Sequence, residues 1–275
     1  MDWLILAILS YLSYAISTSI DKHIMNGKSD ATRTNAWKML FDGTFILILG
    51  VLFFDVNFGT PVIFWGAIVG LIYAASGVTY FRALGTTNVN VVTPIIQSSI
   101  LLVFVFSIIL LAETVDLIDT IAVILLFLGA YVVLSNKNLE IPKIDSNLIL
   151  LFCMVFFASF WAIITKMALD FTKAVELAIT MYYFSSLFTF IYSVFDKRNL
   201  KVELPKIAIS AVFGSTGTLL LYLALAMENA SKVYPISGLQ SVFLFLIAAI
   251  FLKEKFNWNT IIGTIMVILG IYLIA

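Results

Sequence analysis

Apolar residues run in long blocks along the chain, and polar or turn-forming residues separate the blocks at regular distances. A helix needs roughly 20 mostly apolar residues to cross about 30 Å of hydrocarbon in a membrane. Cutting the sequence at charge clusters and at Pro, Gly and Asn turns gives segments of about this length. They run over 3–24, 31–54, 61–84, 90–112, 117–135, 146–168, 174–195, 206–228, 232–252 and 257–275. The pattern therefore predicts ten transmembrane helices joined by short loops.

The apolar blocks are continuous and about twice as long as the alternating segments of a membrane β-barrel, so an all-α integral membrane protein is favoured. Composition agrees, because 62% of the residues are hydrophobic and only 12% are charged, against about 25% charged residues in typical soluble domains. The formal net charge is zero, which provides no basic field for a nucleic acid. The lipid bilayer is thus the predicted environment, and no nucleic acid is expected as a partner.

The second half of the sequence repeats the first. Residues 80–134 align without a gap on residues 221–275, at an offset of 141. The matched positions include Ala83-Leu84 with Ala224-Leu225, Pro94 with Pro235, Glu113 with Glu254 and Gly129 with Gly270. Residues 15–22 resemble 159–166 in the same way. We predict two five-helix repeats, 1–138 and 139–275, and an odd number of helices in each means that the repeats are inverted in the membrane.

The repeated pattern of Ala-Leu, proline, a long apolar run, glutamate and glycine resembles the EamA family of the drug/metabolite transporter superfamily. The resemblance covers the whole chain and occurs twice. It implies a central cavity between the halves, lined by the first, third, fourth, sixth, eighth and ninth helices. It also implies transport of a small molecule: members of the family export amino acids and other metabolites, and relatives carry nucleotide sugars and quaternary cations.

Pro94 and Pro235 each stand about six residues inside a predicted span. Proline removes a backbone hydrogen bond, and paired interruptions of this kind in two repeats point to a transporter's binding site. Neutral polar residues cluster near both prolines and predict a site for a zwitterion or a polyol: Asn90, Gln97, Ser98, Ser237 and Gln240. The alternative is a bend that only serves helix packing.

Aromatic residues are frequent in the helices expected to line the cavity. Tyr14, Tyr80, Trp161 and Tyr222 are the candidates, because their rings combine an apolar face with a hydrogen-bond donor and attract cations. The alternative for each is a position against lipid or in an interfacial belt.

Lys38 and Asp42 lie inside the second predicted span, four residues apart on one helical face. Charges at this depth face the protein interior or water. We expect a self-neutralising structural pair, a carboxylate that responds to protons or other cations, or an anchor for the substrate.

Other charged residues stand near predicted helix ends. Glu113 and Glu254 are expected to cap the start of the next helix, where a carboxylate meets free backbone N–H groups. Arg82 and Lys166 are expected to reach the lipid headgroups, and contact with a substrate is the alternative.

Lysine and arginine residues are distributed unevenly between the two sets of loops. Twelve of these residues lie in or beside the loops that join predicted helices 1 and 2, 3 and 4, 5 and 6, 7 and 8, and 9 and 10. Three lie on the opposite side of the membrane. Cytoplasmic loops are enriched in these residues. We therefore predict that both termini lie on the outer side of the cell membrane. The resemblance implies the opposite, with both termini in the cytoplasm.

No P-loop, HExxH or Ser/His/Asp motif occurs in the sequence, which argues against an enzyme and predicts neither a cofactor nor a metal. We expect a secondary transporter, acting as a monomer or homodimer, that exports a small metabolite by alternating access, with amino acids as the first candidate substrate. The second candidate is proton-coupled efflux of drugs or quaternary cations, and a passive channel is a further alternative.

Overall fold

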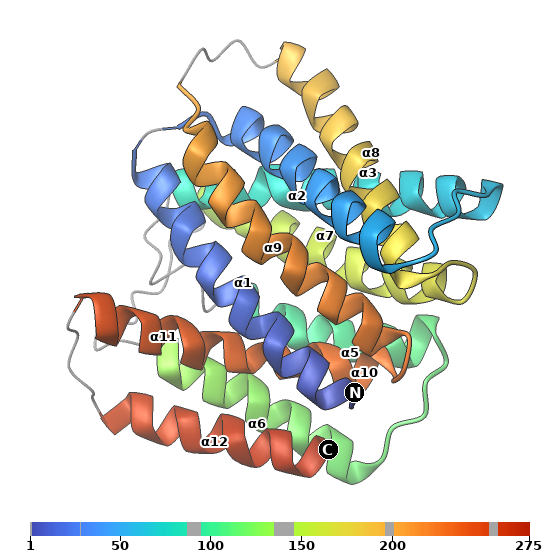
Figure 1. Cartoon of the computed structure of the whole chain (residues 1–275). Helices are drawn as coiled ribbons and strands as arrows, with labels where there is room; N and C mark the ends of the chain where they lie inside the picture. Colours follow the sequence, from blue (N-terminus) through green and yellow to red (C-terminus); the bar gives the residue numbers. More distant parts are fainter. Residues whose placement is uncertain (1, 28, 87–94, 135–145, 196–200, 253–257) are drawn as a thin grey trace.

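The computed structural model describes residues 2–27, 29–86, 95–134, 146–195, 201–252 and 258–275, and these form helices without a strand. The first half contains α1 (Trp3–Asn26), α2 (Ala31–Phe53), α3 (Thr60–Thr86), α5 (Ser99–Leu110) and α6 (Leu117–Leu134). The second half contains α7 (Ser146–Leu169), α8 (Ala174–Phe195), α9 (Leu204–Leu225), α10 (Ala230–Val233), the 3-10 helix η1 (Tyr234–Ser237), α11 (Gly238–Leu252) and α12 (Trp258–Ile274). Figure 1 shows their arrangement.

Short polar side chains set the start of several helices. The Asp30 carboxylate accepts a hydrogen bond from the Arg33 N–H at 2.8 Å and so caps α2. Asp116 does the same for the Asp119 N–H at 2.7 Å, one residue before α6 begins. Such caps satisfy N–H groups that the first helical turn leaves without partners. The polar breaks in the sequence therefore act as helix starts as well as loops.

The predicted spans are present in the structure. Seven described helices are long and apolar enough to cross a membrane, and three shorter apolar helices, Ile95–Leu110, Leu117–Val133 and Trp258–Ile274, accompany them. Large apolar side chains such as Phe53, Ile109 and Val194 are exposed on the outside of the bundle. Lipid accommodates a surface of this kind, whereas water does not. The all-α, ten-helix fold is confirmed, and the chain is a multi-pass membrane protein.

The helices run between two ends of the molecule. Both termini and the connections 54–59, 111–116, 170–173 and 226–229 lie at one end (Figure 1), which we call the terminal end. Residues 29–30 and 201–203 lie at the other end, where the Asp30 N–H donates to the Lys201 carbonyl at 3.1 Å. The predicted domain boundary between 138 and 139 lies outside the described residues.

The last helices of the two halves, α6 and α12, pack against each other through glycine. A Cβ on Gly129 would lie 2.8 Å from the Gly263 carbonyl oxygen, and a Cβ on Gly270 would lie 3.0 Å from the Ala122 carbonyl oxygen. The repeat offset of 141 matches Gly129 with Gly270 and Ala122 with Gly263. The same close contact therefore occurs twice. In one case a glycine of α6 meets the backbone of α12, and in the other a glycine of α12 meets the backbone of α6.

This contact predicts the effect of adding one methyl group. We expect Gly129→Ala to lower the Tm of the purified protein in detergent, because the new Cβ meets backbone rather than a movable side chain. Overpacking of this kind costs about 1–3 kcal/mol. Gly85→Ala in α3 is the matched control, since among the described residues its Cβ would meet only the end of the flexible Met25 side chain within 4 Å. Equal Tm values for both variants would contradict the proposed close packing.

Candidate functional site

A cavity of about 150 Å³ lies between the two halves of the bundle. This volume corresponds to roughly five water molecules at about 30 Å³ each. Its walls come from α1 and α5 in the first half and from α7, α9, η1 and α11 in the second half. The lining residues are Tyr11, Tyr14, Ser99, Ile100, Val103, Ala158, Trp161, Ala162, Leu221, Tyr234, Ser237 and Gln240.

Trp161 is the centre of an aromatic cluster at this cavity. Its ring centroid lies 5.0 Å from that of Tyr73, 6.4 Å from Tyr222 and 6.3 Å from Tyr234. The indole N–H lies near the Tyr222 hydroxyl but makes no hydrogen bond of ordinary geometry with the described residues. A ligand in the cavity can thus meet aromatic ring faces.

The interruption at Pro235 shapes one wall. Proline cannot donate a backbone hydrogen bond, and the chain here changes from α10 through the 3-10 turn η1 into α11. The carbonyl of Tyr234 accepts a hydrogen bond from the Tyr11 hydroxyl at 3.3 Å. The turn places Tyr234 and Ser237 on the cavity wall, so the irregular backbone borders the cavity.

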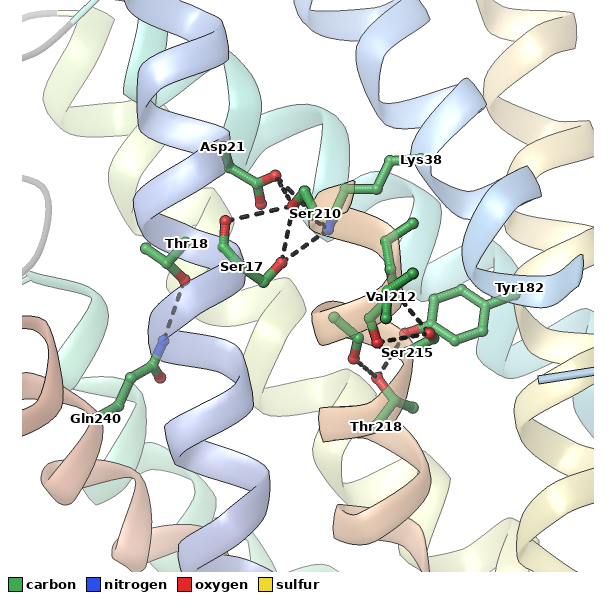
Figure 2. Close-up of polar contacts among 12 residues, drawn as sticks. Ser17, Thr18, Asp21, Lys38, Tyr182, Ser210, Val212, Ser215, Thr218 and Gln240 are labelled. Atoms are coloured by element: carbon green, nitrogen blue, oxygen red, sulfur yellow. Dashed lines mark hydrogen bonds and ion pairs between the residues drawn. The ribbon is translucent and has the colours of Figure 1, made fainter. Parts of the chain in front are cut away.

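Hydrogen bonds connect the cavity wall to the rest of the bundle. The hydroxyls of Tyr14 and Tyr182 both bond to the Thr218 hydroxyl, at 2.8 Å and 2.5 Å. Gln240 donates to the Thr18 hydroxyl at 3.2 Å, which ties α11 to α1 (Figure 2). The orientation of Tyr14 and Gln240 is therefore fixed by partners outside the cavity.

The predicted substrate residues fall into distinct groups. Tyr14, Trp161, Ser237 and Gln240 line the cavity. Tyr222 and Pro235 are buried directly behind this wall, Tyr222 against the Trp161 ring.

The remaining predicted residues lie elsewhere. Tyr80 packs against Phe81 within α3, Gln97 donates to Ser241 at 2.8 Å, and the Ser98 hydroxyl bonds to the nearby Ile95 carbonyl. None of the three is part of the cavity lining. Asn90 and Pro94 lie outside the described residues.

Lys38 pairs with a different carboxylate from the one expected. Its ammonium lies 3.6 Å from Asp21 of α1 and donates to the hydroxyls of Ser17 and Ser210, at 2.9 Å and 2.8 Å. Ser210 in turn donates to Asp21 at 2.5 Å, which closes the network across α1, α2 and α9 (Figure 2). The prediction that Lys38 pairs with Asp42 is wrong, because Asp21 and Ser17 of α1 lie beside the Lys38 ammonium. The sequence of α2 alone does not reveal these partners.

Asp42 remains buried without such support. Its exposed fraction is 1%, and neither carboxylate oxygen has a hydrogen-bond partner among the described residues. The Ser215 backbone N–H lies near the carboxylate without meeting hydrogen-bond geometry. A buried charge in this position is expensive unless it is paired or neutralised.

Sequence reasoning missed several residues of these networks. Asp21 precedes Lys22 near the end of α1 and was not distinguished from interfacial charges, although its spacing from Ser17 puts both on one face. Tyr73, Tyr182 and Thr218 lie in apolar spans and become recognisable only when α3, α8 and α9 come together.

Charged residues near the helix ends also have specific partners. Glu113 accepts hydrogen bonds from the backbone N–H groups of Ala230 and Ser231, both at 2.8 Å. It therefore caps α10 in the other half, not the following helix α6, because the chain fold brings the α5–α6 connection to the α10 N-terminus. Lys166 donates to the carbonyls of Leu225 and Glu228 at the end of α9, and Arg82 lies over the Tyr192 ring.

Comparison with known proteins agrees with this architecture. The model of the EamA-like transporter family matches residues 1–135 and again 146–275. The chain belongs to this family. It is thus a membrane transporter of the drug/metabolite type with the two-repeat EamA fold.

Two similar proteins add to the comparison. An uncharacterized protein of Methanocaldococcus jannaschii is 39% identical over 67 residues, which are 24% of this chain and 49% of that protein. The chain thus spans about half the length of this relative. A crystal structure of a protein at 12% identity has a TM-score of 0.78 and covers 98% of this chain and 97% of its own. At that identity the likeness shows the fold alone.

The Glu113 cap gives a prediction for stability. We expect Glu113→Ala to destabilise the protein by about 1–3 kcal/mol, because two N–H groups lose a charged acceptor. The Tm in detergent measures the effect. Asp170→Ala is the control, since Asp170 also lies at the terminal end but is exposed. A Tm unchanged by Glu113→Ala would show that the cap contributes nothing to folding.

Proposed function

We propose that the protein is a secondary transporter that exports a small organic metabolite, with amino acids as the first candidate substrates. The observation that carries this proposal is the cavity whose walls come from both halves of the EamA-like fold. A site between two repeats can open to either side when one repeat moves against the other. Substrate identity and direction of transport are parts of the proposal.

The chemistry of the cavity supports a zwitterion. Among the described residues that line it, no side chain carries a formal charge. The amide of Gln240 and the hydroxyls of Tyr14 and Ser237 offer donors and acceptors for a carboxylate and an ammonium group. The faces of Trp161 and Tyr234 suit an apolar side chain or the ammonium group. An amino acid with an uncharged side chain has no net charge near neutral pH, which agrees with uncharged cavity walls.

Alternating access by two inverted repeats is supported by contacts that cross the halves. The α6–α12 glycine contact occurs twice with exchanged roles, as expected for a pseudo-two-fold axis between inverted repeats. At the terminal end, Glu113 binds α10 and Asp119 lies 3.5 Å from Lys232. We propose that these contacts close the terminal end in this state and separate when the cavity opens there.

The aromatic walls also support a second candidate, efflux of drugs or quaternary cations coupled to protons. Tyr11, Tyr14, Trp161 and Tyr234 present several rings to one small cavity, and a cation is attracted to such ring faces. Against a cationic substrate, the carboxylates of Asp21 and Asp42 are not part of the cavity lining, so neither of them meets a cation bound there.

Transport by reconstituted vesicles distinguishes the two candidates. We expect vesicles preloaded with an amino acid to take up the labelled compound by counterflow, with no such uptake of quaternary cations. Trp161→Ala is expected to reduce counterflow roughly tenfold, because a loss of about 1.4 kcal/mol in binding corresponds to this factor. Tyr272→Ala removes an exposed ring on α12 and serves as the control. Counterflow of cations alone would replace the amino-acid proposal by the second candidate.

The proposed orientation in the plasma membrane has both termini outside, since the sequence assigns twelve lysine and arginine residues to the loops and helix ends on the side opposite to the termini and three to the other side. A reporter active only in the cytoplasm should therefore be inactive when it is fused after Ala275. The same reporter inserted between Gly59 and Thr60, at the terminal end, should also be inactive. Activity at both positions would reverse the orientation.

A further inference from the structure

Asp42 is a buried acid that the hydrogen-bond network of its neighbours leaves out. The network joins Lys38, Asp21, Ser17 and Ser210, whereas both oxygens of Asp42 lack a partner among the described residues. We propose that Asp42 is a proton-binding site and that its protonation is coupled to substrate binding in the cavity. This proposal rests on the transport function proposed above.

The charge balance of the cluster is the first argument. Asp21, Lys38 and Asp42 have exposed fractions of 3%, 6% and 1%. The Lys38 ammonium donates to the hydroxyls of Ser17 and Ser210 and lies 3.6 Å from the Asp21 carboxylate. Because the Lys38–Asp21 pair is already neutral, an ionised Asp42 would add an uncompensated negative charge at the depth of the membrane. One bound proton makes the whole cluster neutral.

Among the residues that the structure describes, Asp42 has no second cation in its surroundings. Lys38 on α2 and Asp21 on α1 are the charged groups that act on it. The neighbouring helices α3 and α8 contribute the tyrosine hydroxyls of Tyr73 and Tyr182, and α9 contributes Ser210 and Ser215. Within the described residues, Lys38 is therefore the positive charge for which both carboxylates compete.

Gly214 keeps the space between these groups open. A Cβ at this position would lie 2.9 Å from Lys38 Nζ, 3.1 Å from Ser17 Oγ and 3.2 Å from Asp42 Oδ1. The glycine thus faces the ammonium and Asp42 at once, and no side chain on α9 separates them there. The Lys38 side chain can move between Asp21 and Asp42 without displacing the backbone.

Hydrogen bonds, together with neighbouring positions along α1 and α9, connect this space to the cavity. The Thr218 hydroxyl donates to the Gly214 carbonyl at 3.2 Å and accepts from Tyr14, which lines the cavity. On the other side, Gln240 of the cavity wall donates to Thr18, the neighbour of Ser17 in α1 (Figure 2). A change in the Lys38 contacts to Ser17 or Ser210 therefore alters the packing of α1 against α9. Both helices contribute residues to the cavity wall.

The proposed step is a simple protonation. The Asp42 carboxylate takes up one proton from water and becomes a neutral carboxylic acid, and no other bond forms or breaks. When the proton leaves, Lys38 faces two carboxylates, and its attraction to Asp42 competes with its bonds to Ser17 and Ser210. Lys38 thus has two arrangements, one in contact with Ser17, Ser210 and Asp21 and one drawn toward Asp42. The change between these arrangements links proton binding to substrate binding.

Vesicle transport under an imposed pH gradient tests the proposal. With the membrane potential held at zero, we expect wild-type vesicles to accumulate the amino acid against its gradient, up to about tenfold for one pH unit and one proton per substrate. Asp42→Asn should abolish this accumulation and retain counterflow without a gradient. Asp170→Asn, at an exposed acid, should behave as wild type.

The outcomes separate the two proposals. Absence of counterflow in the wild-type protein contradicts the proposed function itself. Counterflow without any effect of the pH gradient, or gradient-driven accumulation by Asp42→Asn, contradicts the proton site. Accumulation driven by a sodium or potassium gradient in place of the pH gradient would overturn the assignment to a proton.

A measurement on the unmodified protein does not depend on how the variant folds. Coupled binding is reciprocal, so substrate must change the number of bound protons if protonation changes substrate affinity. We expect addition of the transported amino acid to wild-type protein in weakly buffered detergent to shift the pH of the solution. A constant pH despite measured substrate binding would overturn the proposal.

Discussion

Hydrocarbon offers no partner for a polar group, and the structure of this protein follows from that constraint. The backbone is satisfied within helices, and hydroxyls inside the spans bond back to their own helix, as Ser159 does to the Val155 carbonyl. Where helices end, charged side chains supply the missing partners: Glu113 binds free N–H groups and Lys166 binds free carbonyls. Charged side chains that would be solvated in a soluble protein thus bind backbone groups of distant segments.

The same constraint explains why the cavity lies where it does. An interrupted helix inside a membrane is tolerated where its backbone is covered by protein or borders a water-accessible space. At Pro235 the turn η1 is covered on one side by Tyr11, whose hydroxyl binds the Tyr234 carbonyl, and borders the cavity with Ser237. The two halves therefore meet at the irregular segment, and its polar groups become the wall of a binding site.

Hydropathy alone predicted the ten spans, because length and apolar character are local properties that the bilayer selects. The break at Pro235 was predictable for the same reason, since proline acts on its own helix. The partner of Lys38 and the target of Glu113 were not predictable. They depend on Ser17 and Asp21 meeting Ser210, about 190 positions away, and on a loop of one half reaching a helix of the other. Such contacts leave no periodic signal.

The duplicated sequence also shows that matched positions of the two halves hold different kinds of side chain. The offset of 141 matches Gly214 with Tyr73, and the offset of 144 that relates 15–22 to 159–166 matches Ser17 with Trp161. Gly214 and Ser17 border the ammonium of Lys38, whereas Tyr73 and Trp161 form the closest ring pair of the aromatic cluster. Continuing the second offset matches Lys38 itself with Tyr182, which also contacts Tyr73. One copy of the position therefore holds buried charges, and the other holds aromatic rings that pack in tilted and edge-to-face arrangements.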